Sequence, residues 1–155
     1  MRRAIGTVLG ALYLLGCGGA ESDVDAAAAP LTLAGVAHDT DDCWGGKTYL
    51  TLEADPAVPG RYQGESYSET SPIPDAPFRA SSRVEAERSG SVLHVSEVET
   101  LHADKLPGWL RWCEAEFDLV WDEGPEGVAL TGDWYSADCG CLGDVEFAVA
   151  KTWGG

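Results

Sequence analysis

The sequence predicts an all-β domain, either a single antiparallel up-and-down barrel of about eight strands or a two-sheet sandwich, stapled by disulfides. Turn residues interrupt residues 31–155 at short intervals, and apolar side chains alternate with polar ones between the turns. No stretch has the spacing of a convincing amphipathic helix. A barrel would leave no exposed sheet edge, because its first and last strands pair.

Each expected strand is an alternating run bounded by Gly, Pro, Asp or Ser. In chain order the expected strands are 31–37, 47–53, 61–68, 78–87, 91–99, 110–121, 128–136 and 145–152. The sixth alternates most clearly, with Phe117, Leu119 and Trp121 on one face and acidic residues on the other. In the seventh, Leu130 and Trp134 are expected to face inward. That pattern indicates a strand with one face in a core and the other in water.

The beginning of the chain has the organisation of a secretory signal peptide. Two arginines after the first Met precede an uncharged apolar run that is too short to span a bilayer. The run ends in Leu14-Leu15-Gly16-Cys17, which resembles the lipobox of bacterial lipoproteins. The resemblance implies that residues 1–16 are cleaved off and that the Cys17 thiol is lipidated. An ordinary signal peptide with an incidental cysteine is the alternative.

Residues 17–30 are small and acidic and contain no aromatic side chain, which is the composition of a tether. We therefore expect a folded domain at residues 31–155 that acyl chains anchor to a membrane without spanning it. Gly18 stands where the inner-membrane retention signal of enteric bacteria has an aspartate. The expected location is therefore the bacterial cell envelope, at the outer membrane.

The five cysteines are an odd number, and assigning Cys17 to the lipid leaves an even set. Export would place that set in an oxidising compartment, where disulfides form. In an up-and-down order all four remaining cysteines gather at one end of the domain. Barrel closure then favours the pairs Cys43–Cys141 and Cys113–Cys139, although the opposite pairing stays open. A four-cysteine zinc site and a redox-active C-x-C at residues 139–141 are the alternatives.

Two short segments and the glycine-bounded hairpins carry a second resemblance. Residues 33–35 read Leu-Ala-Gly, and residues 130–134 read Leu-Thr-Gly-Asp-Trp. These segments resemble calycin-type small β-barrels, and the resemblance covers residues 31–155. The Gly-x-Trp signature of lipocalins is not met, because Val and Ala follow Gly35. No lipocalin ligand is therefore carried over.

The charge balance excludes some functions. The chain has 26 acidic and 10 basic residues and a net charge of −16, which argues against nucleic acid and against charge-driven adhesion to anionic lipid. It contains no nucleophile elbow, metalloprotease helix, phosphate-binding loop or dinucleotide fingerprint. We therefore expect no cofactor and no metal site, and a non-enzymatic protein is favoured.

The end that gathers the cysteines is also the expected ligand end. Its candidate residues are Trp44, Trp109, Trp112, His38 and His102. Exposed Trp beside a barrel mouth stacks on sugars or apolar ligands, whereas packing over the disulfides is the alternative. We expect a lipid-anchored envelope protein whose domain is a binding or structural module, with a small ligand or an envelope protein as partner. The alternative is an envelope hydrolase or metal-binding protein that uses the loop His and Asp residues.

Overall fold

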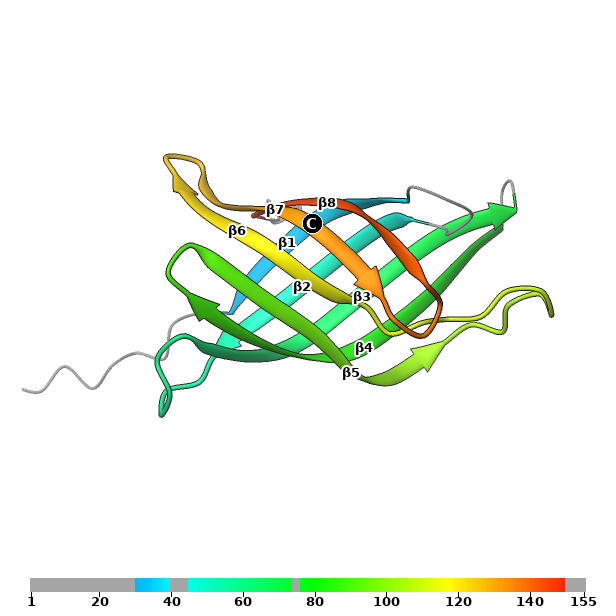
Figure 1. Cartoon of the computed structure of the whole chain (residues 1–155), viewed down its shortest axis with the longest axis horizontal. Coiled ribbons are helices and arrows are strands. Elements are labelled where there is room, and N and C mark those ends of the chain that lie inside the picture. The colour runs from blue at the N-terminus through cyan, green and yellow to red at the C-terminus, as the bar shows by residue number, and fades with distance from the viewer. Residues whose placement is uncertain (1–29, 40–44, 74–75, 150–155) are drawn as a thin grey trace, which may run out of the picture.

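The computed structural model describes residues 30–39, 45–73 and 76–149, and all regular elements in these ranges are β-strands. Each strand pairs antiparallel with the next, and β8 pairs with β1, so the sheet closes into a barrel (Figure 1). The strands are β1 (Leu31–Asp39), β2 (Gly46–Ala54), β3 (Arg61–Ile73), β4 (Ala76–Ser89), β5 (Val92–Ala103), β6 (Glu116–Gly124), β7 (Gly127–Ser136) and β8 (Cys141–Val149). The predicted all-β barrel is confirmed, and the sandwich alternative is wrong.

Nowhere in the described part of the chain is there a helix long and apolar enough to cross a membrane.

The up-and-down order gives the barrel two distinct ends. The connections after β1, β3, β5 and β7 lie at one end, which we call the mouth end. The chain enters β1 at the opposite end, which we call the base, directly after Pro30. At the mouth end the β3–β4 hairpin and the segment that follows β5 extend beyond the other strands (Figure 1).

Closure between β1 and β8 needs a close backbone approach. Trp134 Nε1 on β7 donates a 2.9 Å hydrogen bond to the carbonyl oxygen of His38 on β1, across β8. Gly143 lies beneath this bond, where a Cβ would overlap both the His38 carbonyl and the Trp134 indole nitrogen. A glycine is therefore required at this point of β8.

Apolar side chains fill the half of the barrel nearer the base. The sixth and seventh strands place their alternating residues as predicted, with Leu119 and Leu130 fully buried. The buried core consists of Leu33, Leu50, Leu52, Val84, Ala86, Leu93, Val95, Phe117, Leu119, Trp121, Leu130, Trp134, Val145 and Phe147. This core provides the main driving force for folding, because the burial of apolar surface dominates stability.

Aromatic and charged side chains cover the core at the base. Tyr62 stacks on Trp121 with ring centroids 5.9 Å apart, and the Arg88 guanidinium carbon lies 4.3 Å from the Trp121 ring. Glu123 accepts hydrogen bonds from Trp121 Nε1 at 2.8 Å and from Arg88 Nη1 at 3.3 Å. The base is therefore a packed end of the barrel, in contrast to the mouth.

The strand boundaries differ most from the prediction around the mouth. β3 was expected to end at residue 68 but continues to Ile73, because a register shift after Thr70 accommodates Pro72. β5 continues to Ala103 with two register shifts against β4. Residues 110–115, predicted as the start of the sixth strand, are not a strand, because Cys113 is held by a disulfide outside the ladder.

A matched pair of substitutions on β6 tests the position of the core. We expect Leu119→Ala, at a side chain with 0% exposure, to lower the free energy of unfolding by about 2–5 kcal/mol. Val120→Ala, at the neighbouring residue with 52% exposure, should change it by less than about 0.5 kcal/mol. Urea unfolding of both variants measures the difference. Equal effects would show that Leu119 does not face the barrel interior.

Candidate functional site

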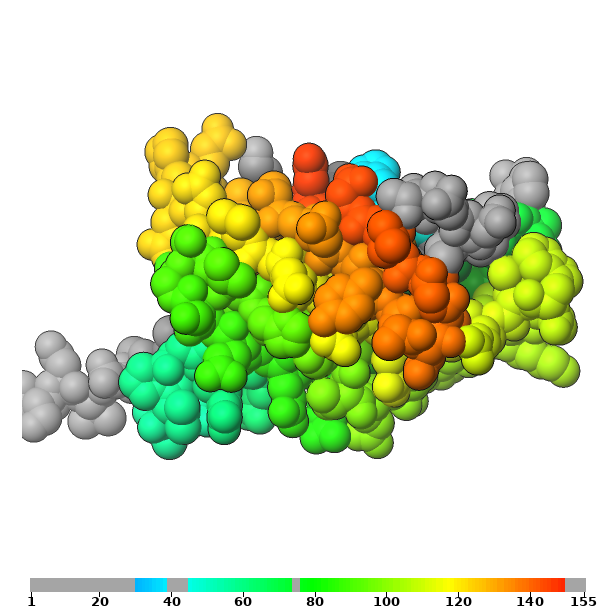
Figure 2. Space-filling model, viewed as in Figure 1, coloured from blue at the N-terminus to red at the C-terminus, as the bar shows by residue number. Residues whose placement is uncertain are grey.

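The mouth half of the barrel contains a cavity of about 490 Å³. Its walls are the inner faces of the strands and a connecting segment, residues 104–115, which we call the mouth segment. In the space-filling view the mouth segment is part of the lobe at the right of the molecule (Figure 2). The volume lies within the range typical of small-molecule sites.

Hydroxyl side chains replace the apolar core where the cavity begins. Thr48 on β2, Ser82 on β4 and Ser136 on β7 are each at most 5% exposed and line the cavity. Thr70 on β3 is also buried, and its Oγ1 donates a 2.9 Å hydrogen bond to the Gly45 carbonyl. Among the described residues, Ser136 Oγ is a buried side-chain atom with no hydrogen-bond partner. A small molecule in the cavity could supply that partner.

One acidic side chain, Glu97, points into this polar half of the barrel from β5. Ser66 Oγ donates to Glu97 Oε1 at 2.5 Å, and the Ala115 amide donates to Oε2 at 3.0 Å. Burial raises the pKa of Glu97 above its ordinary value, and hydrogen bonds from Ser66, Ala115 and Ser82 offset only part of this effect. Glu97 is thus a half-buried carboxyl group, and its hydrogen-bond partners among the described residues are uncharged donors.

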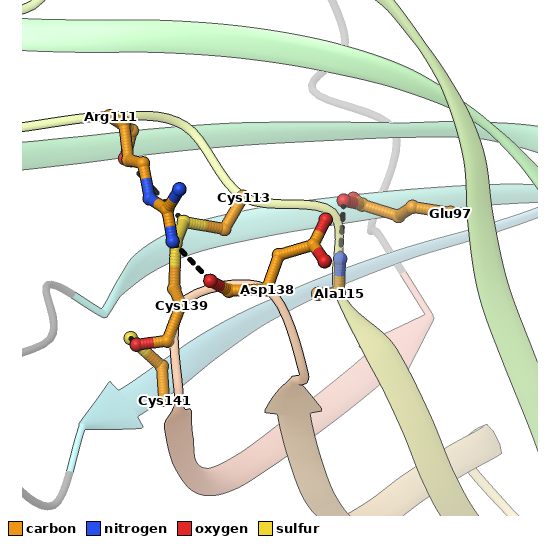
Figure 3. Close-up of a disulfide and its surroundings, with 7 residues drawn as sticks. All are labelled: Glu97, Arg111, Cys113, Ala115, Asp138, Cys139 and Cys141. Carbon is orange, nitrogen blue, oxygen red and sulfur yellow. Dashed lines mark hydrogen bonds between the residues drawn. A yellow bond between two sulfur atoms is a disulfide. The ribbon is translucent and has the colours of Figure 1, made fainter.

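The mouth segment is attached to the barrel at several points. A disulfide joins Cys113 to Cys139 in the β7–β8 turn, with Cα atoms 6.1 Å apart. Arg111 donates to the Asp138 carbonyl in the same turn, and the Ala115 amide bonds to Glu97 (Figure 3). These contacts hold the segment along the cavity, so its side chains form part of the wall.

The described cysteines occupy the mouth end, as expected from the strand order. The pair Cys113–Cys139 is formed, which confirms that the barrel carries a disulfide. Cys141 lies at the start of β8 and lines the cavity. Its expected partner Cys43 lies outside the described residues, as does Cys17. The pairing Cys43–Cys141 and the lipidation of Cys17 therefore remain predictions.

The predicted ligand residues divide into two groups. Trp109 and Trp112 both line the cavity from the mouth segment, and Trp109 is 66% exposed. His38 and His102 are exposed on the strands and do not line it. Trp44 lies outside the described residues.

Trp112 is held by a 2.9 Å hydrogen bond from its Nε1 to the Asp104 carbonyl. Trp109 stays accessible at the mouth, where it can cover an apolar part of a ligand.

Glu97 and Ser136 are not among the residues that the sequence predicts for a ligand site. A signal for Glu97 was present, because strict alternation from Leu93 and Val95 places Glu97 on the same inner face. Ser136 belongs to the expected seventh strand, two positions after the inward Trp134. Alternation could not indicate that Glu97 of β5 accepts a hydrogen bond from Ser66 of β3 over the intervening β4, because this contact depends on the register of three strands.

The outer wall brings together a serine, a histidine and an aspartate. His94 Nδ1 lies 2.7 Å from Asp118 Oδ1, and His94 Nε2 lies 3.2 Å from Ser96 Oγ. Glu116 also lies 3.5 Å from His94 Nε2. Tyr135 donates a 2.6 Å hydrogen bond to Glu116, which raises the pKa of Tyr135 to about 12.

This connectivity resembles that of a nucleophile–base–acid triad, but its surroundings favour a structural network. Ser96 pairs with Glu85 on β4 and with Glu116 on β6. The amide of Glu97 donates to the Ala115 carbonyl at 2.9 Å. The amide of Glu97, next to Ser96, is thus engaged and is not free to bind the oxyanion that acyl transfer forms. We interpret the cluster as cross-strand pairing between β5, β6 and β7.

Comparison with known proteins adds no assignment: no protein-family model, curated protein or solved structure matches the chain. Among the described residues, no group of three or more His, Cys, Asp or Glu side chains is placed to hold a metal ion. The function must therefore be argued from the cavity itself.

The environment of Glu97 predicts a pH dependence of stability. Because its pKa is raised, the folded protein binds more protons than the unfolded chain between the ordinary pKa of 4.5 and the raised value. The Glu97 contribution is therefore favourable below pH 4.5 and is lost as the pH rises through the folded-state pKa. Glu97→Gln removes this dependence, since its oxygen can accept from Ala115 while its amide donates to Ser66.

We expect Glu97→Gln to have a Tm a few degrees above that of the wild type near neutral pH and an equal Tm near pH ~4. Thermal unfolding followed by circular dichroism across this range measures the difference. Glu99→Gln is the matched control, because Glu99 lies on the outer wall in an exposed ion pair with Arg83. A pH-independent effect of Glu97→Gln would contradict the prediction.

Proposed function

We propose that this chain is a lipid-anchored protein of a bacterial cell envelope that binds a small ligand inside its barrel. The observation that carries the ligand-binding part is the cavity of about 490 Å³ at the mouth end, into which Ser136 presents an unpartnered hydroxyl. Buried polar groups are normally hydrogen-bonded, so an unpartnered one beside a cavity favours an occupant that completes it. The accessible Trp109 supplies an apolar contact at the entrance.

The anchoring part of the proposal rests on the sequence. The lipobox-like segment that ends in Cys17 and the small, acidic residues 18–30 have the order expected of signal, anchor and tether. Fully extended, residues 17–30 would reach about 50 Å. They would join the barrel at its base, so the cavity would open away from the membrane.

Binding is favoured over hydrolysis by the placement of the histidines. His38 and His102 do not line the cavity, and His102 lies 3.5 Å from Asp104 on the outside of the barrel. A hydrolase or metal-binding protein built on these residues would thus have its reacting groups outside the space that encloses a ligand. No observation on the described residues favours that alternative.

The anchor is tested by substituting the lipidated residue. We expect the wild-type protein to partition with the outer membrane after cell fractionation, and Cys17→Ser to be lost from it. Palmitate labelling of the wild type but not of Cys17→Ser provides the chemical readout. Ser22→Ala, a substitution in the expected tether, is the control and should leave both results unchanged. Membrane partition of an unlabelled Cys17→Ser protein would contradict lipid anchoring.

The cavity is tested with an uncharged fluorescent probe. We expect prodan to bind the full chain in detergent with a blue-shifted emission, because it would leave water for a largely enclosed site. Ala80→Phe places a larger side chain on the inner face of β4 and should weaken binding at least about tenfold. Ser81→Phe, on the outer face of the same strand, is the control. Equal binding by both variants, or no binding by the wild type, would contradict the proposal.

A further inference from the structure

One carboxyl group that lines the mouth cavity has no cation in contact with it among the described residues, and this observation points to the occupant. Among the described residues that line it, the acidic side chains are Glu69 and Glu97, and Arg111 is the one base. Glu69 forms a 3.0 Å ion pair with Arg79, so its charge is compensated. Arg111 donates to the Asp138 carbonyl beside the disulfide at the entrance (Figure 3). Glu97 thus has no cationic partner among the described residues.

The position of Glu97 makes the lack of a cationic partner significant. It lies opposite Val84 of β4 and follows the buried Val95 on the inner face of β5, at the boundary between the apolar core and the hydroxyl-lined cavity. A carboxylate at such a site is normally paired, because burial removes part of its hydration. Hydrogen bonds from Ser66 and Ala115 hold the group in place but supply no opposite charge.

The surrounding hydroxyls define the kind of cation that fits. Ser82 on β4 and Ser136 on β7 line the same cavity, and Ser136 Oγ has no partner. A hydroxyl can both donate and accept, whereas an ammonium group has three donors and no acceptor. A primary ammonium could therefore donate to Glu97 and to neighbouring hydroxyls at the same time. A fully alkylated ammonium could make none of these bonds.

The remaining walls define the rest of the molecule. Phe117 and Trp134 line the cavity on its deep side, and Trp109 and Trp112 line it at the entrance. These surfaces suit an apolar or aromatic body attached to the ammonium group. The net charge of −16 would also raise the local concentration of a small cation and repel anions.

We propose that the mouth cavity binds a small organic primary amine, with its ammonium group paired to Glu97 and its apolar body against the aromatic walls. This inference rests on the proposed ligand-binding function and narrows it to one chemical class. It also assigns to Glu97 the role of the residue that selects cations over neutral ligands of the same shape.

The test compares three probes of similar shape and different charge. Phenethylamine, phenethyl alcohol and phenylpropanoate are titrated into the full chain in detergent near neutral pH and followed by isothermal titration calorimetry. We expect phenethylamine to bind at least about tenfold more tightly than the alcohol, and the carboxylate to bind most weakly. This comparison uses the wild-type protein and does not depend on any variant folding correctly.

Glu97→Gln then identifies the group responsible. It should weaken phenethylamine binding at least about tenfold and leave the binding of phenethyl alcohol within about twofold. Glu99→Gln, two positions along β5 but paired with Arg83 on the outer wall, should leave both unchanged. Added KCl tests whether a simple inorganic cation competes with the amine for the cavity. K⁺ should not displace phenethylamine beyond the effect that screening has at that ionic strength.

Two results would overturn the assignment in different ways. Equal affinities of the amine and the alcohol, in the wild type and in Glu97→Gln, would refute cation recognition while prodan binding upheld the cavity as a ligand site. Failure of prodan and of all three probes to bind would refute the proposed ligand-binding function itself.

Discussion

The pairing of β8 with β1 is the constraint on which the rest of this structure depends. It joins residues 33–39 to residues 143–149 and converts a meander of hairpins into a closed surface. Closure gives the two faces of every strand different surroundings, since one face lines the lumen and the other contacts water. The hydrogen bond from Trp134 to the His38 carbonyl, made across Gly143, lies at this seam. Without the seam there would be neither a core nor a cavity.

The lumen has a filled half and an open half. Toward the base, large aliphatic and aromatic side chains fill the space completely enough that Leu33, Val84, Leu93 and Leu130 have 0% exposure. Toward the mouth, serines and threonines occupy the corresponding inward positions, and their smaller volumes leave room for a ligand. The barrel thus obtains its free energy of unfolding mainly from the filled half, and the proposed ligand would contact the hydroxyl-lined half. Substitutions in the hydroxyl-lined half should therefore cost less stability than truncations in the core.

The alternation of residues was sufficient to predict an all-β domain, as a barrel or a sandwich of about eight strands, and the buried faces of several strands. On β6 and β7 the pattern identified Phe117, Leu119, Leu130 and Trp134, because regular pairing keeps every second side chain inward. The gathering of the described cysteines followed from strand order alone. These features depend on local periodicity and chain direction, both of which the sequence expresses directly.

Prediction failed where tertiary contacts override periodicity. Residues 110–115 alternate like a strand, but the Cys113–Cys139 disulfide and the contacts of Arg111 and Ala115 hold them outside the sheet. The histidines were expected to contribute to the ligand end, but His102 lies on the outer face of β5 opposite Ser81, because β5 continues to Ala103 instead of ending at residue 99. A cavity cannot be predicted from periodicity either, because it depends on how inward side chains from distant strands fill a shared volume.

The register shifts in β5 also determine how many of its carboxylates face the lumen. Val84 faces Glu97 and Arg83 faces Glu99, so one unpaired residue, Val98, separates the two carboxylates in the ladder. This bulge directs Glu99 to the outer wall, where it pairs with Arg83 at 3.1 Å. Residue-for-residue pairing would instead turn Glu99 inward beside Glu97 and give the lumen two negative charges. The backbone register therefore leaves Glu97 as the carboxylate that β5 turns into the lumen, which agrees with the monovalent cation proposed above.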